Sequence, residues 1–69
     1  MWLEMILDGS DLAKMQEEEN NDGVTGTAVL ADFLNGEKAT QCQIMTYRDE
    51  DECGSFYCEF IYYVKAEGE

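Results

Sequence analysis

The sequence predicts a small α+β domain in which an antiparallel sheet of about four strands carries one or two short helices on one face. Three observations predict this class. The segment SFYCEFIYYVK at residues 55–65 alternates apolar and polar side chains, as a half-buried strand does. The segment DLAKMQEEE at residues 11–19 consists largely of helix formers. A hydrophobic fraction of 45% is ample for a folded core, whereas disorder requires low hydrophobicity.

The 69 residues form a single acidic globular domain, 1–69, of which 66–69 are expected to be a loose tail. A chain of this size buries only about 60% of its unfolded surface, so the core is small. The predicted core draws on every element: Leu3, Met5, Leu12, Met15, Val29, Phe33, Ile44, Phe56, Cys58, Phe60 and Val64.

The first two elements are a strand and a helix. Residues 2–7, WLEMIL, are apolar except for one glutamate, which favours a half-buried strand. A turn is expected at Asp8-Gly9, after which Ser10 is predicted to cap a helix. Glu17, Glu18 and Glu19 stand at the helix end, where the dipole disfavours anions, so we expect fraying through EENNDG.

Residues 24–34, VTGTAVLADFL, allow two interpretations. A helix capped by Thr27 and ended by Gly36 would place four apolar residues in one stripe: Val29, Leu30, Phe33 and Leu34. A strand would lead into Asn35-Gly36, which is a strong hairpin signal. The strand separates apolar from polar residues onto opposite faces, and we favour it for that reason.

Residues 39–48 and 55–65 are predicted to be strands joined by the acidic loop of TYRDEDECGSF. One face of the last strand carries Phe56, Cys58, Phe60, Tyr62 and Val64. The opposite face carries Tyr57, Glu59, Ile61, Tyr63 and Lys65.

Negative charge is the outstanding property of the composition. Sixteen Asp and Glu oppose four Lys and Arg, for a net charge of −12 and a pI near 4.1. A small domain stays soluble with a net charge of about 2–8 in magnitude. The excess implies self-repulsion and excludes binding to nucleic acid or to an anionic membrane by charge attraction. The expected partners are therefore cationic.

Catalysis and metal binding lack the residues they need. The chain has no His, and the spacing of Cys42, Cys53 and Cys58 is not that of a zinc site. We expect Cys42 and Cys58 to be core residues. A calcium loop starting at Asp49 matches at positions 1, 3 and 6 but has Phe60 where a bidentate Glu is needed. No catalytic residue, metal or cofactor is predicted, and the protein is not expected to be an enzyme.

The carboxylates are expected to act as a contact surface. Spacings of about 5–6 Å on a helix face are comparable to those of successive backbone phosphates. In size and charge the chain is similar to small phage-encoded DNA-mimic inhibitors, among them anti-CRISPR and anti-restriction proteins. The predicted function is inhibition of a basic nucleic-acid-binding protein or complex by occupying its groove. The predicted partner-binding residues are Asp49, Glu50, Asp51, Glu52, Glu17, Glu18, Glu19 and Asp22.

The expected state is a monomer or weak homodimer in the cytoplasm, which would be the host cytoplasm for a phage protein. No direct contact with nucleic acid or membrane is expected. Two alternatives remain open. One is a calcium- or cation-binding module. The other is a phage or plasmid accessory protein that binds its partner through exposed aromatic side chains.

Overall fold

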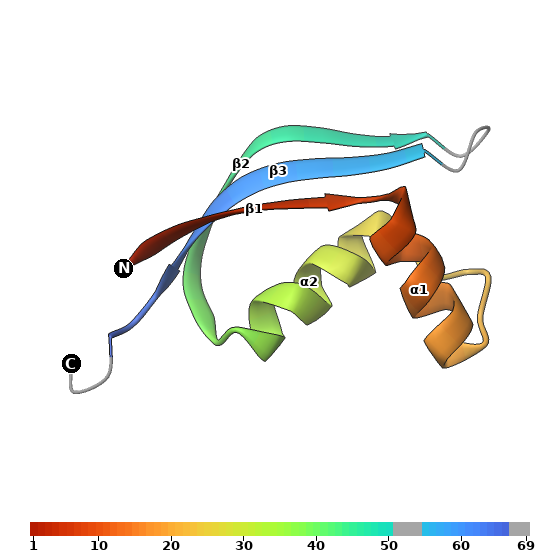
Figure 1. Cartoon of the computed structure of the whole chain (residues 1–69), viewed down its shortest axis with the longest axis horizontal. Helices are drawn as coiled ribbons and strands as arrows, with labels where there is room; N and C mark the ends of the chain where they lie inside the picture. Colours follow the sequence, from red (N-terminus) through yellow and green to blue (C-terminus); the bar gives the residue numbers. More distant parts are fainter. Residues whose placement is uncertain (51–54, 67–69) are drawn as a thin grey trace.

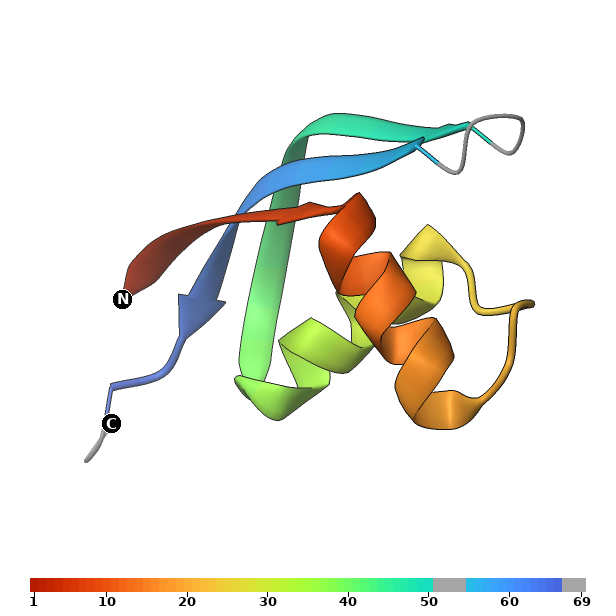
Figure 2. The same ribbon diagram turned by 45° about the vertical axis from the view of Figure 1, so that its right-hand side comes forward.

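The computed structural model in Figure 1 describes residues 1–50 and 55–66. Three strands form one antiparallel sheet in the order β1-β3-β2. Both helices lie on the same side of this sheet (Figures 1 and 2), and no other described element covers its opposite face. The α+β prediction is confirmed, with three strands where about four were expected. In chain order the elements are β1 Trp2–Asp8, α1 Gly9–Glu19, α2 Gly26–Gly36, β2 Ala39–Glu50 and β3 Ser55–Val64.

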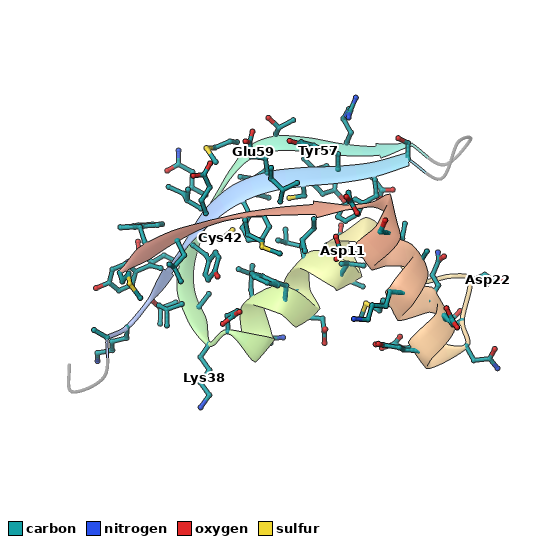
Figure 3. All side chains as sticks on the ribbon, in the orientation of Figure 1. Asp11, Asp22, Lys38, Cys42, Tyr57 and Glu59 are labelled. Atoms are coloured by element: carbon teal, nitrogen blue, oxygen red, sulfur yellow. The ribbon has the colours of Figure 1, made fainter. Side chains whose placement is uncertain are left out.

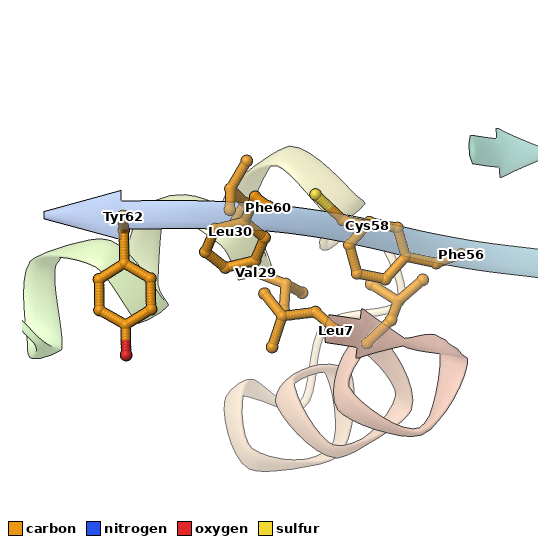
Figure 4. Packing of buried hydrophobic residues seen from close by; sticks show 8 residues of the cluster. Leu7, Val29, Leu30, Phe56, Cys58, Phe60 and Tyr62 are labelled. Carbon is orange, nitrogen blue, oxygen red and sulfur yellow. The ribbon is translucent and has the colours of Figure 1, made fainter. Parts of the chain in front are cut away.

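The central strand β3 supplies half of the buried core. Its alternate side chains face the helix layer (Figure 4), and all four of Phe56, Cys58, Phe60 and Tyr62 are buried. Phe33 of α2 meets the rings of Phe60 and Tyr62 edge to face, with centroids 5.6 and 5.2 Å apart. Edge-to-face pairs are favoured by the ring quadrupole. The predicted period of the last strand is confirmed.

Most of the predicted core is found in or against the hydrophobic cluster. Leu12, Val29, Phe56, Cys58 and Phe60 are buried, and Leu3, Met5, Met15, Phe33 and Val64 pack against them. The prediction missed Leu7, Leu30 and Tyr62.

Ile44 was wrongly placed in the core. It pairs with Phe60 and therefore faces the helix layer, yet 48% of its surface is exposed. The cause is its position on β2, an edge strand of the sheet.

The favoured strand over residues 24–34 is wrong, because the segment folds as α2, Gly26–Gly36. The helix is capped by Thr25, whose Oγ1 accepts a hydrogen bond from the Ala28 amide at 3.2 Å. The predicted cap, Thr27, already lies inside the helix. Val29 and Leu30 are buried on the side that meets the sheet. This packing covers apolar strand side chains that a fourth strand would have left in water.

The start of α1 also differs from the prediction. Its cap is Asp8, whose Oδ1 accepts a hydrogen bond from the Ser10 amide at 2.9 Å. Asp11 returns the interaction, since its Oδ2 accepts from the Asp8 amide at 2.8 Å. Together they form a capping box that satisfies amides at the helix start. Asp8 therefore ends β1 and begins α1 without an intervening turn.

Replacing the observed cap should destabilise the fold, whereas replacing the predicted one should not. Asp8→Ala removes a side-chain acceptor from the helix start and is expected to lower the free energy of unfolding by about 1 kcal/mol. Ser10→Ala is the matched control, because Ser10 contributes only its backbone amide to the cap. Urea denaturation of both variants measures the difference. Equal losses would contradict the capping assignment.

Gly26 marks the closest approach of α2 to the sheet. A Cβ at this position would lie 2.5 Å from Cδ1 of Phe56 and 3.0 Å from Oδ2 of Asp49. Gly26→Ala should therefore cost about 1–3 kcal/mol of stability through overpacking. Gly36→Ala has no atom within 4 Å of the new Cβ and should be neutral or stabilising by up to about 1 kcal/mol. Thermal melts of the two variants should shift in opposite directions or by clearly different amounts.

Candidate partner-binding surfaces

The acidic end of α1 is held in place by its own backbone and a glutamine. Asn20 ends the helix in the left-handed conformation (φ 51°), and its amide reaches the carbonyls of Gln16 and Glu17. The Gln16 side chain donates to the carbonyls of Asp22 and Val24, each at 3.3 Å. The loop after α1 is thereby tied back onto the helix. The fraying expected here is not seen, since α1 is regular through Glu19.

Four of the predicted contact residues occupy this segment. Glu17, Glu18, Glu19 and Asp22 are all exposed, and Figure 3 shows Asp22 at the far end of the molecule, beyond α1. They lie in the last turn of α1 and in the loop after it, and we call these four residues the α1-end cluster. Its side chains stand on a backbone segment that these hydrogen bonds hold in place.

The second predicted cluster lies at the end of β2. Asp49 is exposed, and its Oδ2 accepts a hydrogen bond from the Tyr47 hydroxyl at 3.3 Å. The same hydroxyl lies 3.1 Å from Oγ1 of Thr27, in the first turn of α2. Asp49 is therefore both exposed and attached to the start of a helix, where the dipole favours its charge.

The remaining residues of that cluster are not placed. Glu50 closes β2 with its backbone, and Asp51 and Glu52 lie outside the described residues. The end of β2 and the loop after α1 point toward the same end of the long axis (Figures 1 and 2). The structure thus brings Asp49 and the α1-end cluster to one end of the molecule.

A shallow groove of about 250 Å³ separates α1 from α2. Leu7, Met15, Val29 and Phe33 line it with apolar surface. The polar lining is mainly acidic and consists of Asp11, Glu18, Asp32 and Lys14. The groove extends the negative surface along the helix layer but encloses no pocket.

The described carboxylates form no ion pairs with the chain's own cations. Among the described residues, none of Lys14, Lys38, Arg48 and Lys65 forms an ion pair with an Asp or Glu. Arg48 instead lies over the ring of Tyr57, with its guanidinium carbon 5.3 Å from the ring centroid. The negative field of the described surface is therefore open to an external partner or to solvent ions.

The two described cysteines show no sign of a reactive site, and Cys53 lies outside the described residues. Cys58 is fully buried, and this burial together with the nearby Cys42 raises the pKa of its thiol. Cys42 is exposed, so its predicted core position is wrong, although nearby protein atoms also raise the pKa of its thiol. A raised pKa keeps a thiol protonated and weakly nucleophilic at neutral pH. Within residues 1–50 and 55–66, no three acidic or cysteine side chains are arranged to hold a metal ion.

The sheet face away from the described helices carries a second surface, which the sequence analysis raised only as the alternative of binding through exposed aromatic side chains. Trp2, Glu4 and Ile6 of β1 pair with Tyr63, Ile61 and Glu59 of β3. Figure 3 shows Tyr57 and Glu59 on the side away from the helices. We call these residues with Tyr57 the open face. The alternation along β3 predicted that these residues share one face, but it did not show that no described helix or strand packs against that face.

Comparisons with protein-family models, with curated proteins and with solved structures returned no match to this chain. Neither of the two described helices is long and apolar enough to cross a bilayer. The fold and the surfaces above are therefore the only basis for a function.

Unpaired like charges predict a specific response to salt. Raising NaCl from 10 mM to 0.5 M should raise the melting temperature, because screening relieves repulsion while few ion pairs are lost. Each kcal/mol of relieved repulsion should raise it by about 4–8 °C. A melting temperature that falls with NaCl in the same calorimetric series would contradict this electrostatic picture. Sulfate is avoided, since it stabilises proteins by another route.

Proposed function

We propose that the protein is an acidic inhibitor that occupies the positively charged nucleic-acid groove of a partner protein. The observation that carries the proposal is the end of the molecule where Asp49 and the α1-end cluster lie, exposed and without ion pairs among the described residues. A net charge of −12 gives the whole chain a field of the sign that a Lys- and Arg-lined groove attracts.

The mechanism is steric occupancy guided by charge. Opposite fields speed encounter, and the association rate should fall steeply as salt is added. The Gln16 bonds that hold the loop after α1 support binding, because an ordered cluster loses little conformational freedom on docking. No chemical step is required of the protein. Within this proposal it works in the cytoplasm beside its target, as a phage-type anti-defence protein such as an anti-CRISPR or anti-restriction inhibitor would.

Removing charge from the α1-end cluster should weaken inhibition more than removing the same charge elsewhere. The test variant carries Glu17→Gln, Glu18→Gln, Glu19→Gln and Asp22→Asn. The control variant carries Asp32→Asn, Glu37→Gln, Glu67→Gln and Glu69→Gln, which also removes four carboxylates, none of them in the α1-end cluster. We expect at least about a tenfold higher inhibitory concentration for the test variant, equivalent to 1.4 kcal/mol. Equal effects would show that only net charge matters.

The order of addition tests occupancy directly. Purified CRISPR effector complexes and restriction enzymes are assayed for DNA cleavage with the protein added before or after the duplex. A groove blocker inhibits when added first and loses most of its effect once DNA is bound. Inhibition that is independent of order would contradict groove occupancy, as would a failure of duplex DNA to displace the protein from a complex that it inhibits.

A further inference from the structure

The open face has a regular pattern of side chains. Trp2 lies opposite Tyr63, Glu4 opposite Ile61, and Ile6 opposite Glu59. Facing positions along the strands repeat about every 6.7 Å. These last two pairs form a square on the sheet. Ile6 and Ile61 occupy one diagonal of the square, and Glu4 and Glu59 occupy the other. An aromatic pair, Trp2 and Tyr63, flanks this square at one end, and its rings are in edge-to-face contact 5.5 Å apart.

This face exposes more apolar surface than single scattered residues would. Trp2 is 48% exposed and Ile6 is 46% exposed, and Tyr57, Ile61 and Tyr63 are half-buried around them. Contiguous apolar surface surrounded by polar groups is typical of interaction sites. The three strands span about 10 Å from edge to edge, which matches a helix diameter of about 10–12 Å. The chain's own two helices already pack against the other face of the same sheet.

The charges on the face indicate what can cover it. A second copy docked face to face would bring two Glu4 and two Glu59 side chains together, with a net charge of −12 on each molecule. Nucleic acid could stack on the aromatic rings, but stacking platforms lie in positive grooves. On this face Arg48 pairs with Tyr57 across the strands and lies over its ring. A cationic partner is the complementary one.

We propose that the open face is a docking surface for a cationic amphipathic helix of a partner protein. Glu4 and Glu59, as diagonal neighbours, have backbones about 7–8 Å apart. Two basic side chains one turn apart on a helix are about 5–6 Å apart at their Cβ atoms and are long enough to reach both carboxylates. The apolar stripe of the same helix would cover Ile6, Ile61 and the ring of Trp2. This surface lies outside the α1-end cluster and does not depend on the groove-blocking function.

Trp2 is the only tryptophan in the chain, and it lies on this face, so its fluorescence reports directly on docking. The probe is an 18-residue synthetic helix with leucine in one stripe and lysine elsewhere. A peptide of the same composition, shuffled to lose the stripe, controls for charge attraction. We expect saturable binding with a blue shift of Trp2 emission for the striped peptide only.

The variants compare two isoleucines of the open face with one on the helix side of the sheet. Ile6→Thr and Ile61→Thr should each raise the dissociation constant by about tenfold. Ile44→Thr, at a side chain that is 48% exposed but on the helix side, should change it by less than about twofold. Ile6→Thr on the edge strand keeps the test valid if Ile61→Thr impairs folding, which circular dichroism checks. Glu4→Gln with Glu59→Gln should weaken binding and reduce its salt dependence.

Several results would overturn the proposal. Equal binding of the shuffled peptide would mean that only charge is recognised, and equal effects of Ile6→Thr and Ile44→Thr would move the site off the open face. Self-association in sedimentation that Ile6→Thr abolishes would make a second copy the occupant. If Trp2 emission responds to single-stranded oligonucleotides but not to the striped peptide, the occupant of the open face is nucleic acid. The four-residue Gln and Asn variant of the α1-end cluster should still bind the peptide, so this proposal and the inhibitor proposal fail separately.

Discussion

The fold depends on the burial of one side of β3 beneath two short helices. Phe56, Cys58, Phe60 and Tyr62 form a continuous apolar row that only a layer on that side can remove from water. The two helices of this 69-residue chain can cover only one side of the sheet. The helices therefore take the side with the unbroken apolar row, and the mixed side stays open. Gly26 shows how close this packing is, since the start of α2 rests against Phe56.

The one-sided core determines where the charge goes. Carboxylates on the inner layer would lose hydration without a partner, and no charged residue is buried there. Two acids serve the fold itself, in the capping box of α1. The others that are described stand at element ends, on outer helix surfaces, or among the apolar residues of the open face. The molecule thus separates a strongly acidic end from a sheet face that mixes apolar and acidic side chains.

Strand periodicity was the part of the fold that the sequence predicted best, because the two faces of β3 differ so clearly. Residues 24–34 were misassigned because Asn35-Gly36 can end a helix as well as form a hairpin, and tertiary packing decided between the two. The exposure of the α1-end cluster followed from its polarity. Its attachment through Gln16 could not be predicted, since those bonds join a side chain of α1 to carbonyls six and eight positions later, in a loop without regular structure.

The exposure of the open face is the most important consequence of this fold. Hydroxyl-radical footprinting measures that exposure directly. Trp2, Tyr57 and Tyr63 lie on the open face, while Phe60 and Tyr62 lie beneath the helices. We expect rapid oxidation of Trp2, Tyr57 and Tyr63. Phe60 and Tyr62 should stay protected until the protein unfolds. Protection of Trp2, Tyr57 and Tyr63 in the isolated monomer, or oxidation of Phe60 at the same rate, would contradict this expectation.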